Sequence, residues 1–188
     1  IVLENGEWTK AETPMPDAVY NRCYTDSMRI AERLERIIGT RKVFNEFTLF
    51  DKYIVFHILA KSKLKQFIIP TFKYSDETLI KLLNQQGSAL IKPSKGSMGS
   101  HVYKITMEDN LYKAYLHSTL SPRIFKQTDT MLNYLAGIMK WRSFVIQPFI
   151  SFMRLNGHIF DIRLLVQKNE GGIWEVTATA SRVCYKSS

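Results

Sequence analysis

The sequence lacks the features that mark membrane, secreted and zinc-binding proteins. No apolar run approaches the roughly 20 residues that cross a bilayer, and no signal peptide is visible. The only two cysteines, Cys23 and Cys184, lie far apart, which fits neither a disulfide framework nor a zinc site. Because free thiols are typical of a reducing compartment, we expect a cytoplasmic protein without a membrane span.

Negative charge is also scarce. The chain has 17 Asp and Glu residues against 26 Lys and Arg residues, so its net charge is +9. Such a balance admits nucleic acid, a membrane surface or a polyphosphate as a partner. The positive residues are scattered, however, and no recognised nucleic-acid motif accompanies them. The densest run, at 61–65, also fits a solvated helix end, so the charge does not favour a nucleic-acid partner.

The chain does have enough apolar residues to bury a core, with 45% hydrophobic residues among 188. It begins with Ile1 rather than Met, which suggests a start inside a longer protein. Apolar spacing and turn residues predict interleaved helices and strands. We expect helices at 28–38, from 51 onward, at 76–86 and at 127–139. We expect strands at 18–20, 43–44, 67–69, 89–91, 101–106, 111–117 and 144–146, and antiparallel pairs at 1–12 and at 159–167 with 173–180.

The strongest candidate for chemistry is the small-residue loop after the strand at 89–91. Lys92 stands at the end of that strand, where its ammonium group could meet a phosphate. Gly96 and Gly99 would let backbone N–H groups approach phosphate oxygens. Three serines add hydroxyl donors: Ser94, Ser97 and Ser100. A mobile surface hairpin remains the alternative, because the loop is not a Walker A sequence.

Two further stretches carry weaker signals. Asp51 and Lys52 open a helix, where an acidic residue also fits ordinary dipole chemistry. Gln147 and Pro148 end an apolar strand, and Pro148 indicates a bend or an edge because it cannot donate to a ladder. Such a bend could present backbone groups, or the Gln147 carbonyl, to the edge of an adenine. A strand that merely ends there is the alternative.

The last stretch places charge inside an apolar strand. Asp161 and Arg163 alternate with Phe160, Ile162 and Leu164, so both charged groups lie on one face. Arg163 could bind a phosphate or a carboxylate through two hydrogen bonds. A structural ion pair between Asp161 and Arg163 is the other interpretation.

In their order along the chain, these pieces resemble an ATP-grasp domain. Segments 16–22, 90–99 and 157–168 resemble in particular the YheC/YheD family of bacterial endospore coat-associated proteins, over nearly the whole chain. The Asp-Ile-Arg element at 161–163 is also similar to glutamate ligases that modify a ribosomal protein. The resemblance implies an α+β ATP-grasp fold, in which two subdomains with antiparallel sheets flanked by helices grip ATP.

The resemblance also implies a division of the chain. Residues 1–40 would be the end of a preceding domain, and 41–143 would be the N-terminal subdomain with the phosphate flap. Residues 144–188 would begin a C-terminal subdomain that is incomplete here.

By match to the family's motifs, Lys52 and Lys92 would contact phosphates. The flap over them would consist of Ser94, Gly96, Ser97, Gly99 and Ser100. The adenine would be framed, mostly by backbone groups, by Gln147, Phe149 and Ile150. Arg163 and Arg182 would be catalytic, facing the γ-phosphate and the acyl-phosphate.

The implied reaction activates a carboxylate with ATP as an acyl-phosphate, which an amine or a thiol then attacks, leaving ADP and phosphate. The partners would be ATP and an unidentified carboxylate and amine pair. An inactive nucleotide-binding or structural protein of the spore coat, or a basic nucleic-acid-binding domain, are the alternatives.

Two departures from the family pattern matter. The pattern continues past the second arginine to a Glu-x-Asn strand that holds Mg²⁺, whereas only residues 183–188 follow Arg182 here. We therefore expect the Mg²⁺ ligands beyond Ser188 and no turnover by this fragment alone. Arg154 stands near the place where related hinges carry a carboxylate for the ribose.

Overall fold

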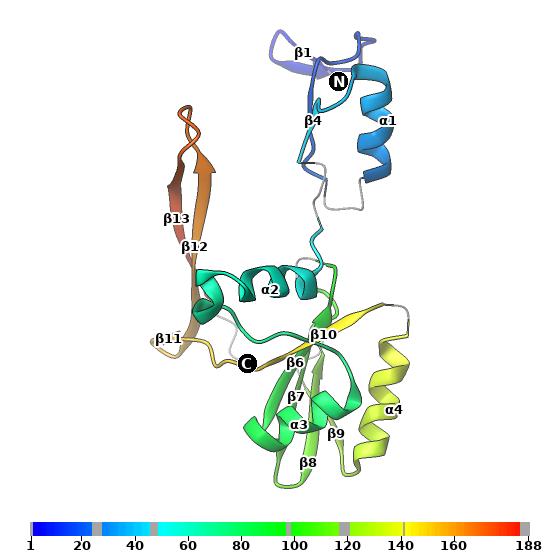
Figure 1. Cartoon of the computed structure of the whole chain (residues 1–188), viewed down its shortest axis with the longest axis vertical. Helices are drawn as coiled ribbons and strands as arrows, with labels where there is room; N and C mark the ends of the chain where they lie inside the picture. The colour runs from blue at the N-terminus through cyan, green and yellow to red at the C-terminus, as the bar shows by residue number, and fades with distance from the viewer. Residues whose placement is uncertain are drawn as a thin grey trace.

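The computed structural model describes residues 2–23, 28–45, 49–96, 99–116, 121–140 and 142–184. The N-terminal elements form two small sheets and a helix (Figure 1). Strands β1 (Val2–Glu4) and β2 (Glu7–Thr9) form the predicted hairpin. Strands β3 (Val19–Tyr20) and β4 (Val43–Phe44) pair in parallel, and helix α1 (Met28–Ile38) connects them.

The central unit is a six-stranded antiparallel sheet with the strand order β5-β10-β6-β7-β8-β9. Its strands have these bounds: β5 Phe72–Lys73, β6 Ser88–Pro93, β7 Tyr103–Glu108, β8 Leu111–Leu116, β9 Arg123–Phe125 and β10 Phe144–Pro148. Helices α3 (Asp76–Gln86) and α4 (Thr128–Ile138) pack on one face of this sheet. The other face is therefore free of these two helices.

The core lies between the two helices and the sheet. Helix α3 begins at Ser75, whose hydroxyl accepts from the Thr78 amide at 3.2 Å, and ends at Gly87 in the left-handed region. Its fully buried Leu79 and Leu83 belong to one hydrophobic cluster with residues of α4 and the strands. Strand β6 alternates buried and half-buried residues, so one of its sides points into this core. Because one side of β6 packs into the core, the side chains on its other side point away from the core.

Helix α2 (Lys52–Ala60) starts as predicted at Asp51, but the predicted strand at 67–69 is wrong. The structure has a 3₁₀ turn, η1 (Lys63–Phe67), capped by the Ser62 hydroxyl, and the strand comes later as β5. Phe67 is 75% exposed, so the apolar run does not enter the core that would hold a strand there. Strand β9 was not predicted, because such a short edge strand has almost no periodic signal.

Strand β10 belongs to the central sheet along its whole length, from Phe144 opposite Pro93 to Pro148 opposite Ala89. Strand β5 pairs only with Val145 and Ile146, so Pro148 has a described partner strand on one side alone. The division expected from the sequence would start a second subdomain at 144. We propose to place this boundary after Pro148 instead.

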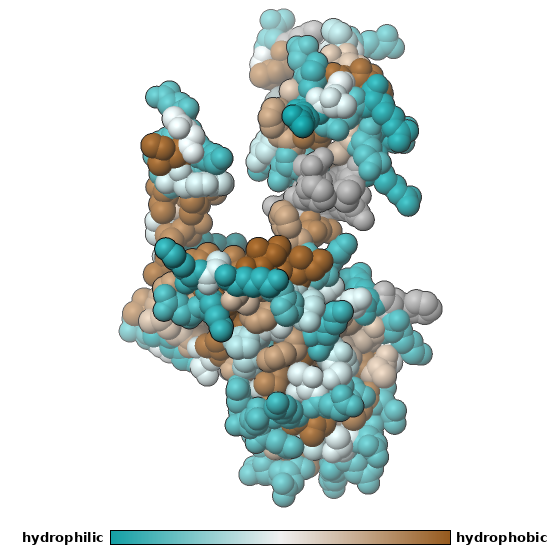
Figure 2. Space-filling model, viewed as in Figure 1, coloured by the Kyte–Doolittle hydropathy of each residue, from teal (hydrophilic) through white to brown (hydrophobic). Residues whose placement is uncertain are grey.

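The C-terminal elements form a three-stranded sheet. Strand β11 (Arg154–Leu155) pairs with β12 (His158–Lys168), which forms the predicted long hairpin with β13 (Trp174–Cys184). Many apolar side chains of this hairpin are exposed, as are Ile54 and Ile58 of α2. Figure 2 shows apolar surface along the hairpin and over α2. None of the helices in the described residues combines the length and the apolar character that a membrane-spanning helix needs.

Candidate functional site

Lys92 projects from the central sheet on the face opposite to helices α3 and α4. Its neighbours Ile91 and Pro93 are buried on the core side of β6, and its cross-strand partner on β10 is Val145. Burial lowers the pKa of the Lys92 ammonium group, and the positive charge of Lys52 lowers it further. A partly desolvated ammonium group next to a second cation is a favourable place for an anion.

Lys52 reaches the same region from the first turn of α2. Asp51 caps this helix, accepting from the amides of Tyr53 at 2.9 Å and Ile54 at 3.2 Å. Burial would raise the pKa of Asp51, but hydrogen bonds from Ile54, the Ser94 side chain and Tyr53 outweigh burial and lower it. The backbone N–H of Lys52 donates to the Ser94 carbonyl at 2.8 Å, which joins the start of α2 to the loop after β6.

The Lys52 side chain is also tied to that loop. Its Nζ atom donates to the carbonyl oxygens of Pro93 at 2.9 Å, Gly96 at 3.0 Å and Ser94 at 3.4 Å. Burial lowers the pKa of Lys52, while the neighbouring Asp51 carboxylate opposes this shift. In the structure, Lys52 therefore contacts the backbone of the loop rather than standing free beside it.

Lys52 and Lys92 border two cavities together. One, of about 310 Å³, is lined with them by the loop residues Gly96, Gly99 and Ser100. The other, of about 410 Å³, is lined with them by Gln147 and by apolar residues of α2 and of the segment before β5. Both volumes lie within the range of small-molecule sites. The structure thus brings the two lysines, the glycine loop and the end of β10 to one place.

The loop itself has the conformation that its glycines permit. Gly96 has φ 150° and Gly99 has φ 72°, values that residues with a Cβ atom rarely adopt. Ser94 is buried, and its backbone N–H donates to the Ser143 carbonyl at 2.8 Å. Ser97, predicted to belong to the flap, lies outside the described residues.

At the end of β10 the side chain of Gln147 is buried and already engaged. Its Nε2 atom donates to the Thr71 hydroxyl at 2.6 Å, which in turn donates to the Ile69 carbonyl. The ring of Phe149 lies 4.0 Å from the ammonium nitrogen of Lys104, measured to the ring centroid. Ile150 is exposed.

Sequence reasoning missed Lys104. It lies between Tyr103 and Ile105, which are both buried in the core, and its cross-strand partner on β6 is Leu90. Strand alternation therefore directs Lys104 to the same face as Lys92. The alternation of apolar and charged residues at 103–105 was the sequence signal that could have predicted this orientation of Lys104.

The two predicted catalytic arginines lie on the hairpin and share one carboxylate. Arg182 is the cross-strand partner of Asp161 and donates to both carboxylate oxygens, through Nε at 3.0 Å and through Nη2. Arg163 also forms an ion pair with Asp161, the alternative interpretation from the sequence, with its Nε atom 3.7 Å from Oδ1. The hydrogen bond from Arg182 is the main cause of the lowered pKa of Asp161. Neither arginine belongs to the lining of the two cavities that Lys52 and Lys92 border.

Carboxylates for a metal ion are not gathered anywhere in the described ranges. Those residues contain no group of three or more His, Cys, Asp and Glu side chains that could hold a metal. Arg154, at the place expected for a ribose-binding carboxylate, donates to the Gly157 carbonyl at 2.8 Å within its own hairpin. The described residues therefore do not fit Mg²⁺ coordination.

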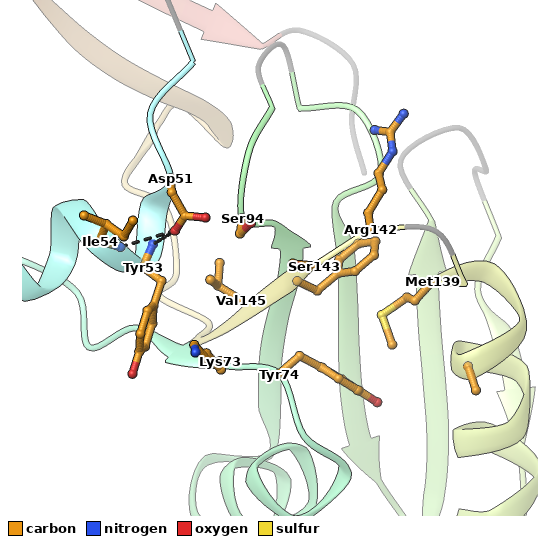
Figure 3. Close-up of a pocket in the computed structure, with 12 residues that line it drawn as sticks. Asp51, Tyr53, Ile54, Lys73, Tyr74, Ser94, Met139, Arg142, Ser143 and Val145 are labelled. Atoms are coloured by element: carbon orange, nitrogen blue, oxygen red, sulfur yellow. Dashed lines mark hydrogen bonds between the residues drawn. The ribbon is translucent and has the colours of Figure 1, made fainter. Parts of the chain in front are cut away.

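A wider cavity of about 750 Å³ lies between the start of α2, β10 and the end of α4 (Figure 3). Its lining includes Asp51, Tyr53, Lys73, Ser94 and Arg142. Figure 3 shows the guanidinium group of Arg142 pointing away from the other labelled side chains. Lys92 is absent from its lining, so this cavity does not share the lysine pair.

Residues 40–188 match the family model described as YheC/D like ATP-grasp. The chain belongs to this ATP-grasp family. The α+β architecture seen here is accordingly the ATP-grasp fold, and family membership supports ATP binding. Lys92 and the loop that follows it lie within the matched range.

Two curated relatives extend the comparison. This ATP-grasp protein is 29% identical to "Endospore coat-associated protein YheD" of Bacillus subtilis (strain 168), over 98% of this chain and 43% of that protein. It is 27% identical to "Endospore coat-associated protein YheC" of the same organism, over 95% of this chain and 52% of that protein. The chain thus spans about half the length of these relatives.

A solved structure, that of D-alanine–D-alanine ligase from Bacillus anthracis, is similar at 14% identity with a TM-score of 0.29. The match covers 73% of this chain and 41% of that one. At this TM-score it adds nothing to the family assignment.

Proposed function

We propose that this ATP-grasp chain binds ATP with the triphosphate beside Lys92 and under the loop from Ser94 to Ser100. The adenine would lie against the backbone of Gln147, Phe149 and Ile150. One observation carries this proposal: Lys52 and Lys92, from separate elements, border the same cavities as the loop glycines and Gln147. A triphosphate needs several positive groups in one place, and both ammonium-bearing residues border these cavities.

The reaction we propose is that of an ATP-dependent carboxylate–amine or carboxylate–thiol ligase. A substrate carboxylate oxygen would attack the γ-phosphorus, and the bond from that phosphorus to the β,γ-bridging oxygen would break, which releases ADP. The amine or thiol would then attack the acyl carbon and release phosphate.

Positive groups must balance the charge on the transferring phosphoryl group. Arg163 and Arg182 are proposed for this role, and they would have to exchange Asp161 for the phosphoryl oxygens. The proposal includes Mg²⁺ as a cofactor of the longer protein, with its ligands expected beyond Ser188 and none among the described residues.

ATP binding can be tested on the chain as it stands. We would measure the shift in melting temperature with MgATP for the wild type, for Lys92→Met and for the control Lys61→Met. Lys61 ends the same helix as Lys52 but is exposed and lines neither cavity. We expect a shift in the wild type and in the control, and a clearly smaller shift in Lys92→Met at the same ATP concentration. Absence of any shift in the wild type would overturn the proposal and make RNA or DNA binding the next measurement.

A nucleotide-binding protein without turnover is the second candidate. It is favoured by the pairing of both proposed catalytic arginines with Asp161, which occupies them with a carboxylate of the protein itself. Release of ADP by the full-length protein with mixtures of carboxylates and amines separates the two. ADP that appears only with a carboxylate present supports the ligase, whereas ATP binding without ADP release supports the second candidate.

We also propose association with the spore coat, because both curated relatives are named endospore coat-associated proteins. Immunoblots of coat and core fractions from purified spores of the source bacterium would test it. Detection in the core fraction alone would count against this assignment.

A further inference from the structure

The ammonium group of Lys52 is fully committed to the backbone of the proposed phosphate loop. It carries three N–H donors, and three carbonyl oxygens accept from it: those of Pro93, Ser94 and Gly96. A phosphate oxygen can therefore receive a hydrogen bond from Lys52 only if one carbonyl gives its bond up. This differs from the arrangement expected from family motifs, in which Lys52 simply contacts phosphate.

The three carbonyls are not equally easy to release. Pro93 lies in β6, paired with Phe144 of β10. Ser94 is anchored twice more, by the bond from its own N–H to the Ser143 carbonyl and by the bond from the Lys52 N–H to its carbonyl. Gly96 lies beyond these anchors, at φ 150°. Loss of its bond to Lys52 would therefore disturb the sheet least.

The position of Gly96 also connects it to the proposed nucleotide. Gly96 lines the cavity of about 310 Å³ together with Lys52, Lys92 and Gly99. A phosphate group that enters this cavity meets both ammonium groups and the Gly96 carbonyl, which is an acceptor and repels an anion. Exchange of the carbonyl for a phosphate oxygen removes this repulsion and strengthens the hydrogen bond, because charge-assisted bonds are the stronger ones.

We propose that Lys52 is a positioning residue that holds the loop against α2 in the nucleotide-free protein and releases Gly96 when a phosphate group binds. The proposal rests on the proposed function and assigns different roles to the two lysines. Lys92, whose ammonium group has no carbonyl partner among the described residues, binds the phosphate in the nucleotide-free arrangement of the loop. Lys52 reaches the phosphate only by exchanging the Gly96 carbonyl for a phosphate oxygen, and so couples binding to a change in the loop. Its charge also lowers the pKa of Lys92, and an anion between the two ammonium groups relieves this unfavourable interaction.

The nucleotide-free half of the proposal can be tested by amide hydrogen exchange with mass spectrometry on the full chain. Lys52→Met keeps the length of the side chain and removes its donors. We expect the amides of 95–100 to exchange about tenfold faster in this variant, the change for loss of roughly 1.5 kcal/mol of charged hydrogen bonding. Lys61→Met, at the C-terminal cap of the same helix, should leave them unchanged. Equal exchange in Lys52→Met and the wild type would overturn the role of Lys52 in holding the loop.

The nucleotide-bound half needs no variant. In wild-type protein labelled with ¹⁵N at lysine Nζ, we expect the Lys52 ammonium signal to shift on addition of MgATP and to gain a coupling to ³¹P across a hydrogen bond. MgCl₂ with sodium sulfate serves as the ionic-strength control and should produce no such coupling. An unchanged Lys52 signal while ATP binds would show that Lys52 stays on its three carbonyls and would overturn the release.

The two proposals fail in different ways. If MgATP does not bind, the proposed function is wrong, while the exchange experiment without nucleotide still decides whether Lys52 holds the loop. If Lys52→Met does not fold, the ammonium signal of the wild type still decides whether Gly96 is released.

Discussion

Gln147 donates an Nε2 hydrogen to the hydroxyl of Thr71 across 2.6 Å, which ties the end of β10 to the segment before β5. The Thr71 hydroxyl in turn donates a hydrogen bond to the Ile69 carbonyl at 3.0 Å, so it serves both as acceptor and as donor. Both side chains are buried, at 8% and 3% exposure. The Nε2 atom of Gln147 thus serves the protein's own structure, while the role of its carbonyl oxygen toward an adenine stays a prediction.

Thr71→Val should therefore destabilise the fold. The substitution keeps the shape of the side chain but leaves the buried Nε2 of Gln147 without an acceptor, which costs about 1–3 kcal/mol. Urea denaturation would measure the loss in the free energy of unfolding. The matched control is Thr130→Val, because the Thr130 hydroxyl forms only an exposed bond of 3.5 Å, and it should lie within about 0.5 kcal/mol of the wild type. A similarly small effect for Thr71→Val would contradict a stabilising role for the buried hydrogen bond between Gln147 and Thr71.

Lys92→Met should separate binding from folding. Loss of the ammonium group should weaken ATP binding by about 1.5–3 kcal/mol, as for hydrogen bonds to charged groups. The free energy of unfolding should stay the same or rise, because the substitution removes a desolvated charge and its repulsion with Lys52. Titration calorimetry and urea denaturation of the same preparation would measure both. Parallel losses of affinity and stability would show that Lys92 is structural.

The affinity for ATP should fall as the pH rises toward 10.5, the ordinary pKa of lysine. Burial, and then the charge of Lys52, lower the pKa of Lys92 in the free protein, whereas bound phosphate favours the ammonium form. Binding therefore takes up a proton wherever the free Lys92 is neutral, and this weakens the affinity above its pKa.

The same lowered pKa has a consequence for folding. Between the pKa of Lys92 in the native state and that in the unfolded state, the unfolded chain binds more protons, so this residue's contribution to stability rises with pH.

The pH dependence of ATP binding can be measured by titration calorimetry at a series of pH values. The ATP affinity should fall less steeply with pH in Lys92→Met than in the wild type. A residual slope would report Lys52, whose pKa burial also lowers. An identical pH profile in Lys92→Met would exclude Lys92 from the site.

Gly99→Val should weaken nucleotide binding more than folding. Gly99 has φ 72° in an exposed part of the loop, where a β-branched residue is strained and crowds the cavity. Gly87, at φ 69°, ends α3 outside the site and offers a control with nearly the same backbone strain. Gly87→Val should lower stability by about 1–2 kcal/mol and leave the ATP affinity unchanged. If the two variants lose affinity and stability in the same proportion, the loop is not the phosphate flap.

Much of the local structure was predictable because short-range chemistry decides it. The Asn5 and Gly6 turn, with φ 49° and 85°, closes the first hairpin as expected. Ser75 and Gly87 begin and end α3, and alternation in β6 places Lys92 on the face away from the core. The prediction at 67–69 failed because apolar residues there had no sheet to join, and local propensity contains no information about that.

Resemblance to known motifs identified the family. Residue type and spacing alone predicted most helices and strands and the set of residues from which a phosphate site could be built. These depend on neighbours in the chain, so they can be read from spacing and residue type. The tertiary structure decided that Lys52 meets three loop carbonyls and that Arg182 takes both oxygens of Asp161. Each of these contacts depends on where a distant backbone or strand register places its partner, and only the packed chain brings such groups within hydrogen-bonding distance.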